Sequence, residues 1–240
     1  METMRQSTGK IQMLFACWII MTAATLMSCG SDYVGNDLTL YPKESSDQLI
    51  PLPFFVRCDN GVPIDPATTT PETPLVTDLG RQPILSPEGN QVTWGEWSKV
   101  TGSIVAECTE AGTKTTLDLQ GLIPNGVYTV WNVTFKDPGF TGEFDSPGLP
   151  ANVKAFGPIG PNDGSQSGFT ASATGEGSIS ATTPPGTLGT VGEIEACALT
   201  DELEWHVVGL YHSDGETHGP VRGPDGNQAE QFAFIFKKAE

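Results

Sequence analysis

A chain of 240 residues is long enough for one domain of about 150–200 residues with a core of its own. Its 28 glycines and 19 prolines imply many turns, and beyond the N-terminus no long window keeps the apolar spacing of an amphipathic helix. The net charge of −17 gives a surface that repels phosphate backbones, which argues against nucleic-acid binding. The composition therefore favours an all-β protein.

The N-terminus is typical of an export signal. Arg5 and Lys10 precede a largely apolar stretch at 11–27, which is short for a membrane span and ends in Leu26-Met27-Ser28-Cys29. This ending resembles the lipobox of bacterial lipoproteins, with Leu three residues before the cleavage site, a small residue directly before it and Cys directly after it. The resemblance implies that residues 1–28 are a signal peptide and that Cys29 is acylated, with palmitate-type chains.

Acylation of Cys29 would make the membrane the first partner of the mature chain. Each buried methylene contributes about 0.8 kcal/mol, so two or more chains anchor a protein stably. We expect a lipid-anchored protein of the bacterial cell envelope, at the outer membrane, because position 30 is Gly and not the Asp of an inner-membrane retention signal. Both a periplasmic and a surface-exposed orientation stay open. An ordinary secretory peptide with a cysteine near its cleavage site is the alternative, and it also exports the chain.

Residues 29–90 are expected to form a tether and a Pro-rich entry segment. Residues 31–46 are polar and suit a spacer between the membrane and the domain. Residues 48–58 are apolar but interrupted by two prolines, which permits an edge strand or an extended lid and excludes a central strand. We expect the compact domain to span residues 91–240.

The remaining chain predicts strands joined by turns. Residues 114–119 alternate between apolar and polar positions, as a half-buried strand does, whereas residues 127–135 are mostly apolar on both faces and should be central. Further runs rich in Val, Thr, Ile, Phe and Trp predict strands at 91–97, 101–108, 169–173, 178–181, 190–198, 203–211 and 231–237. This series predicts a two-sheet antiparallel sandwich, either a jelly roll or an immunoglobulin-like fold.

Three cysteines follow the anchor, namely Cys58, Cys108 and Cys197. An oxidising compartment favours at least one disulfide. We predict a Cys108–Cys197 bond, because both residues lie at ends of predicted strands, and Cys58 then stays free or displaces one partner. No Cys-x-x-Cys spacing occurs, which argues against a redox or structural zinc motif.

The three histidines, His206, His212 and His218, are spaced six residues apart. On a straight strand His206 and His212 would stand about 20 Å apart, too far to share one metal ion. His212 and His218 flank a turn, so a loop could bring them together, with Asp214 or Glu216 as an oxygen ligand for zinc or copper. In the alternative interpretation His206 is a hydrogen-bonded strand residue and the other two are ordinary loop residues.

Two classes of function remain open. The first is a non-enzymatic binding or structural module without a cofactor, which would take a glycan or a protein through its loops. Its tryptophans are compatible with sugar stacking, although tryptophans at strand positions usually belong to the core: Trp94, Trp97, Trp131 and Trp205. The second is a copper- or zinc-binding protein, or a metal-dependent enzyme, that uses His212 and His218. No Gly-x-Ser-x-Gly motif is present, so the sequence offers no nucleophile elbow.

Overall fold

The structure is a computed structural model that describes residues 43–46, 48–52, 55–136, 144–146, 149–194, 197–200 and 202–237. The signal peptide, the lipobox-type ending at Cys29 and most of the predicted spacer lie outside these residues. Within the described part of the chain, no helix has the length and apolar character needed to cross a membrane.

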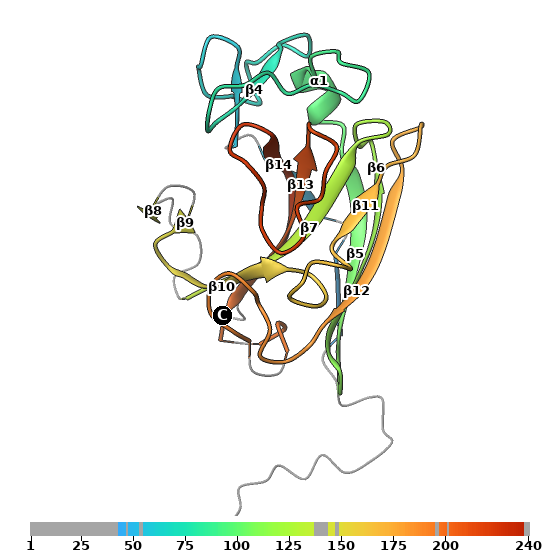
Figure 1. The fold of residues 1–240 in the computed structure, drawn as a ribbon, viewed down its shortest axis with the longest axis vertical. Coiled ribbons are helices and arrows are strands. Elements are labelled where there is room, and N and C mark those ends of the chain that lie inside the picture. The colour runs from blue at the N-terminus through green and yellow to red at the C-terminus, as the bar shows by residue number, and fades with distance from the viewer. Residues whose placement is uncertain are drawn as a thin grey trace, which may run out of the picture. The chain divides into compact units, whose positions relative to one another are not determined.

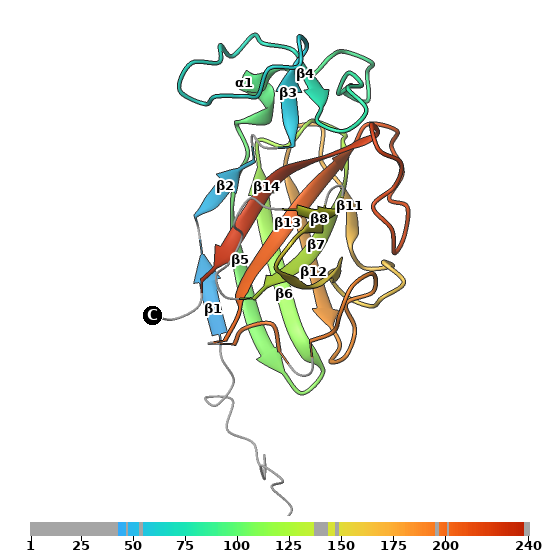
Figure 2. The same cartoon turned by 90° about the vertical axis from the view of Figure 1, so that its left-hand side faces the viewer.

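Two antiparallel sheets form a β-sandwich, which confirms the all-β prediction (Figure 1 and Figure 2). The first sheet has the strand order β1 (Lys43–Ser46), β5 (Thr101–Thr109), β6 (Gly112–Gln120) and β12 (Gly177–Thr183). The second has the order β10 (Val153–Pro158), β7 (Val127–Phe135), β13 (Glu204–His212), β14 (Gln228–Phe236) and β2 (Leu49–Pro51), with β11 (Gly168–Thr170) also paired to β7. Two small hairpins pair β3 (Val56–Cys58) with β4 (Leu75–Thr77), and β8 (Phe144–Ser146) with β9 (Leu149–Pro150).

The core lies between the two sheets. The first sheet contributes alternate residues of β5 and β6, such as Ile104 and Leu117, which are buried, while their neighbours are more exposed. The second sheet contributes Trp205, Val207 and Phe234 to the same cluster. The period-two pattern of residues 114–119 is therefore the inward and outward alternation of a half-buried strand, as predicted.

Strand β7 is central, as its two apolar faces predict. It pairs with β13 on one side and with β10 and β11 on the other. One face places Tyr128 and Val130 in the sandwich core. The opposite face places Trp131 and Val133 in a second buried cluster on the outer side of the sheet.

The prediction of a strand at 91–97 was wrong. The structure has one helical turn there, α1 (Trp94–Trp97), which begins at the N-cap Thr93. Thr93 and Glu96 form a capping box: the Thr93 side chain accepts from the Glu96 N–H, and the Glu96 carboxylate accepts from the Thr93 N–H at 2.8 Å. Residues three apart on a helix share a face, so both tryptophans reach the core. The Thr-x-x-Glu spacing is the sequence signature of this cap.

The segment before residue 91 contributes to both sheets. Strand β1 pairs with β5, and β2 pairs with β14 at the edge of its sheet, where its proline is tolerated. The β3–β4 hairpin and α1 lie together at one end of the sandwich (Figure 1 and Figure 2). Val56, Leu75 and Trp97 belong to the same buried cluster as the sandwich core. Among the described residues the strands of the two sheets therefore start at residue 43, earlier than the start expected at Gln91.

The structure corrects one predicted strand in the C-terminal half. The predicted strand at 190–198 is absent from its described residues, where only an isolated bridge joins Val191 to Phe156.

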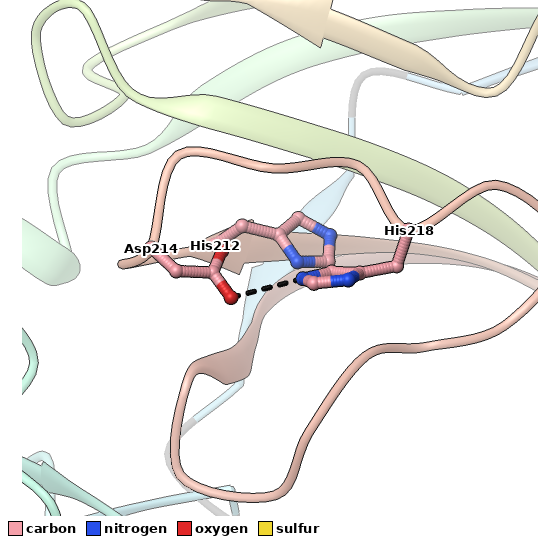
Figure 3. Close-up of side chains that lie close together, drawn as sticks. All are labelled: His212, Asp214 and His218. Carbon is pink, nitrogen blue, oxygen red and sulfur yellow. Dashed lines mark hydrogen bonds and ion pairs between the residues drawn. The ribbon is translucent and has the colours of Figure 1, made fainter.

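The connection between β13 and β14, residues 213–227, carries Asp214 and His218 back towards His212 at the end of β13 (Figure 3).

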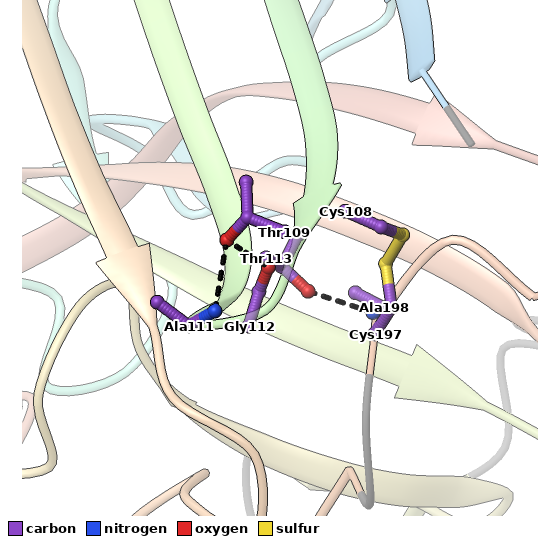
Figure 4. Close-up of a disulfide and its surroundings, with 7 residues drawn as sticks. All are labelled: Cys108, Thr109, Ala111, Gly112, Thr113, Cys197 and Ala198. Atoms are coloured by element: carbon purple, nitrogen blue, oxygen red, sulfur yellow. Dashed lines mark hydrogen bonds between the residues drawn. A yellow bond between two sulfur atoms is a disulfide. The ribbon is translucent and has the colours of Figure 1, made fainter. Parts of the chain in front are cut away.

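The predicted disulfide joins Cys108 to Cys197, whose Cα atoms are 5.7 Å apart (Figure 4). It links the end of β5 to the segment that leads into β13. The N–H of Ala198 donates to the Thr113 side chain at 2.8 Å, which fixes the same segment against β6. Cys58 is free and half-buried.

We expect the free energy of unfolding of a Cys108→Ala/Cys197→Ala variant to be about 2–5 kcal/mol lower than that of the wild type, because the bond closes a loop between residues 89 positions apart. Denaturant unfolding followed by tryptophan fluorescence measures this difference. Cys58→Ser is the matched control and should leave the free energy of unfolding nearly unchanged. Equal stability of all three proteins would contradict a native Cys108–Cys197 bond.

Candidate metal centre

Three side chains that could bind a metal meet at the end of β13. His212, Asp214 and His218 each offer one ligand atom, and these atoms all lie within 4.8 Å of one another. Figure 3 shows the two imidazoles side by side, with the carboxylate facing His218. Ligand atoms of one tetrahedral ion lie about 3.3–3.6 Å apart, because each lies about 2.0–2.2 Å from the metal. The cluster would therefore have to contract slightly to bind an ion.

His212 is the buried member of the cluster, with 1% of its surface exposed. It is the last residue of β13 and shares the outer face of the sheet with Val208 and Leu210. Its Nε2 lies 2.7 Å from the Thr129 hydroxyl oxygen. Its Nδ1 is also buried and makes no hydrogen bond within the described residues. Nδ1 is therefore the nitrogen that could ligate a metal.

Asp214 is held in place by its neighbours. Its Oδ2 accepts hydrogen bonds from His218 Nε2 at 2.9 Å and from the Asn227 side-chain amide at 3.0 Å. Its Oδ1 accepts from the N–H of Glu216 at 3.1 Å. The carboxylate can only accept, so the His218 nitrogen that faces it carries the proton. A metal ion bound at this nitrogen would replace that proton.

The loop reaches His218 through close backbone packing. His218 itself has φ of +57°, a left-handed conformation that is uncommon for a residue with a side chain. Gly223 has φ of +92° and lies against the His218 ring, where a Cβ atom would collide with it. A Cβ atom on Gly164 would likewise collide with the carbonyl of Gly219. These glycines give the imidazole its place beside Asp214.

The charges of the cluster suit metal binding at neutral pH. Burial lowers the pKa of His212 to about 4; the Asp214 carboxylate opposes this shift, while His218 and Arg222 add to it. Burial raises the pKa of Asp214, but the hydrogen bonds from Glu216, His218 and Asn227 outweigh burial and leave it lowered. Near neutral pH the site therefore offers an uncharged imidazole and an ionised carboxylate.

The structure separates the predicted ligands into two groups. His212, Asp214 and His218 come together, whereas the Glu216 carboxylate stands outside the cluster and only its backbone N–H contacts Asp214. His206 has another partner, as its distance along the strand predicts: its Nε2 lies 2.6 Å from Glu204.

Two supporting residues were not found from the sequence. Thr129 contacts His212 across the β7–β13 pairing, and Asn227 contacts Asp214 from the far end of the loop. No local pattern marks Thr129, which is 83 residues from His212. Sugar stacking loses its main support, because the four tryptophans considered for it are buried: Trp94, Trp97, Trp131 and Trp205.

A cavity of about 380 Å³ borders the cluster. His212 and Asp214 contribute to its lining, together with Asn125, residues 85–87 and Gly89. The Tyr211 hydroxyl at this cavity donates to the Leu85 carbonyl at 2.7 Å, and the Asn125 amide lies 3.2 Å from the Glu88 carboxylate. Both groups are thus engaged in bonds to the segment of residues 85–88: Tyr211 from β13, and Asn125 from the turn before β7.

Comparison with protein-family models found no match, and comparison with curated proteins found no significant similarity. Function is therefore inferred from the residues of this site.

We expect the metal-free protein to lose stability as the pH falls from about 6.5 to about 4. In this window the unfolded chain protonates His212 at its ordinary pKa, whereas the folded chain keeps it neutral down to about 4. This difference between the pKa values of His212 in the folded and unfolded chain corresponds to a loss of about 3 kcal/mol at most in the free energy of unfolding.

Urea unfolding in the presence of a chelator, at several pH values, measures this loss in the wild type and in His212→Gln. Burial also lowers the pKa of His206, but that residue is present in both proteins and its contribution cancels. The variant should show a shallower pH dependence. An equal pH dependence of the free energy of unfolding in both proteins would show that burial does not keep His212 uncharged.

Proposed function

We propose that the mature chain is a lipid-anchored protein of the bacterial cell envelope that binds one zinc or copper ion through His212, Asp214 and His218. The observation that carries the proposal is the buried His212 Nδ1, which has no hydrogen-bond partner among the described residues and belongs to a cluster of three potential ligands. Other buried atoms, such as Trp97 Nε1 and Thr115 Oγ1, also lack partners among the described residues, but His212 Nδ1 lies beside other potential ligands, where a bound metal would supply the missing partner.

The chemistry of the donor set selects the metal. Two imidazoles and one carboxylate suit zinc and copper, whereas calcium and magnesium prefer shells made of oxygen. Three protein ligands leave a coordination position for a water molecule or another small ligand. The neighbouring cavity offers room for it beside His212 and Asp214.

Binding is proposed in preference to catalysis. The Tyr211 hydroxyl and the Asn125 amide, which border the cavity, already have structural partners. Burial also raises the pKa of Tyr211, so this hydroxyl is a poor proton donor or acceptor near neutral pH. A metal-dependent enzyme is the second candidate, and the open coordination position favours it.

The first test addresses the metal. The full chain, purified in detergent without a histidine tag, should bind zinc near one equivalent per chain. Asp214→Asn and His218→Ala should each lower the zinc affinity at least about 100-fold, because loss of an outer partner alone typically costs 10- to 100-fold. Competition with a chromophoric chelator measures the affinities.

Glu216→Gln is the matched control for Asp214→Asn. Both changes remove one negative charge from the same loop, but the Glu216 carboxylate lies outside the cluster. The control should bind zinc as the wild type does. Equal losses in the two variants would mean that net charge, not ligation, attracts the ion.

The second test addresses the anchor, which the lipobox-type leader supports. In a bacterial host the wild type should incorporate labelled palmitate and partition into the detergent phase of a Triton X-114 extract, because acyl chains at Cys29 are apolar. Cys29→Ser should remain unlabelled and aqueous. Equal labelling of both proteins would contradict acylation at Cys29.

A further inference from the structure

We infer that Thr129 is a positioning residue for this metal centre: its hydroxyl, oriented by Trp131, holds His212 so that Nδ1 presents its lone pair to the ion. The inference rests on the proposed function and deepens it, since it names the group that selects the ligating atom.

Three buried groups form a continuous chain of hydrogen bonds. The Trp131 indole N–H donates to Thr129 Oγ1 at 2.9 Å, and Thr129 Oγ1 lies 2.7 Å from His212 Nε2. Trp131 and Thr129 are fully buried, and His212 is almost so. The Trp131 ring also stacks on Phe156, with centroids 4.9 Å apart and an interplanar angle of 13°, which fixes the direction of its N–H.

Two arrangements of the hydrogens fit these contacts. An indole N–H can only donate, so Thr129 Oγ1 uses one of its two lone pairs to accept from Trp131. The second lone pair can accept the Nε2–H of His212. In the opposite arrangement the threonine hydroxyl donates to Nε2, and the imidazole hydrogen moves to Nδ1.

A metal ion at Nδ1 decides between the two arrangements. In the metal-free protein each leaves one buried hydrogen without an acceptor among the described residues: the Thr129 hydroxyl hydrogen in the first, and the Nδ1–H of His212 in the second. A buried donor without a partner costs about 1–3 kcal/mol in either case. An ion bound at Nδ1 takes the lone pair of that nitrogen and requires the imidazole hydrogen on Nε2. Thr129 Oγ1, 2.7 Å away, is then the acceptor of that hydrogen.

This arrangement matches the general requirement for a histidine ligand. A metal-bound imidazole donates its other N–H to an outer partner, which fixes the ring and its tautomer. Here the partner comes from the neighbouring strand, because β7 and β13 are paired and Thr129 and His212 lie on the same face of the sheet.

The test compares three substitutions in the full chain. Thr129→Val removes the hydroxyl and keeps the branched shape, and we expect it to lower the zinc affinity 10- to 100-fold. Thr129→Ser keeps the hydroxyl and should restore an affinity within about threefold of the wild type. Thr134→Val is the matched control, since Thr134 is a buried threonine of the same strand whose hydroxyl bonds the Ala155 carbonyl at 3.4 Å. It should leave the zinc affinity unchanged.

A second readout separates positioning from a loss of stability. Nitrogen-15 NMR of the zinc-loaded protein should show the hydrogen of His212 on Nε2 and the metal at Nδ1 in the wild type and in Thr134→Val. In Thr129→Val the Nε2–H proton resonance should move upfield, because this hydrogen loses its acceptor.

The inference is overturned if Thr129→Val binds zinc as tightly as the wild type, or if zinc binds wild-type His212 through Nε2. A wild-type chain that binds neither zinc nor copper overturns the proposed function itself, and this outcome is seen before any variant is compared.

Discussion

The pairing of β7 with β13 is the interaction on which both the core and the site depend. These strands run antiparallel along their whole length, with Trp131 opposite Val208. One face of the pair supplies Val130 and Val207 to the sandwich core, and the other face places the Thr129 hydroxyl against His212. A register shift by one residue would reverse both faces. The apolar core therefore fixes the register that also assembles the candidate centre.

The candidate centre combines burial, charge and an unpaired polar atom. Many buried polar groups are paired, as the Asn132 side chain is with Trp205 and Thr183. A few buried atoms lack a partner among the described residues, including Trp97 Nε1 and Thr115 Oγ1. His212 Nδ1 differs from these because it lies in a cluster of potential ligands with a charged carboxylate, and burial depresses the pKa of His212. Violations of local rules concentrate at functional sites, where a ligand supplies the missing interaction. A metal bond to Nδ1 would remove this cost, which is the physical reason for placing function here.

The sequence predicted features that depend on local patterns. Residues 127–135 were identified as central because both faces are apolar, and the turn between His212 and His218 indicated that a loop could bring them together. The sequence did not reveal contacts that depend on strand pairing, such as Thr129 with His212. It also did not reveal that β1 and β2 pair with distant strands. At Thr93 the β-forming tryptophans favoured a strand, but a capping box with Glu96 and the burial of two residues on one helical face prevailed.

X-ray absorption spectroscopy of the zinc-loaded full chain tests the central claim most directly, because it reports the atoms bound to the ion. The account predicts a first shell of nitrogen and oxygen at about 2.0–2.1 Å with the outer-shell scattering of two imidazoles. A sulfur shell at about 2.3 Å would place the ion at a cysteine, and an all-oxygen shell without imidazole scattering would place it among the surface carboxylates. Either result would contradict a centre formed by His212, Asp214 and His218.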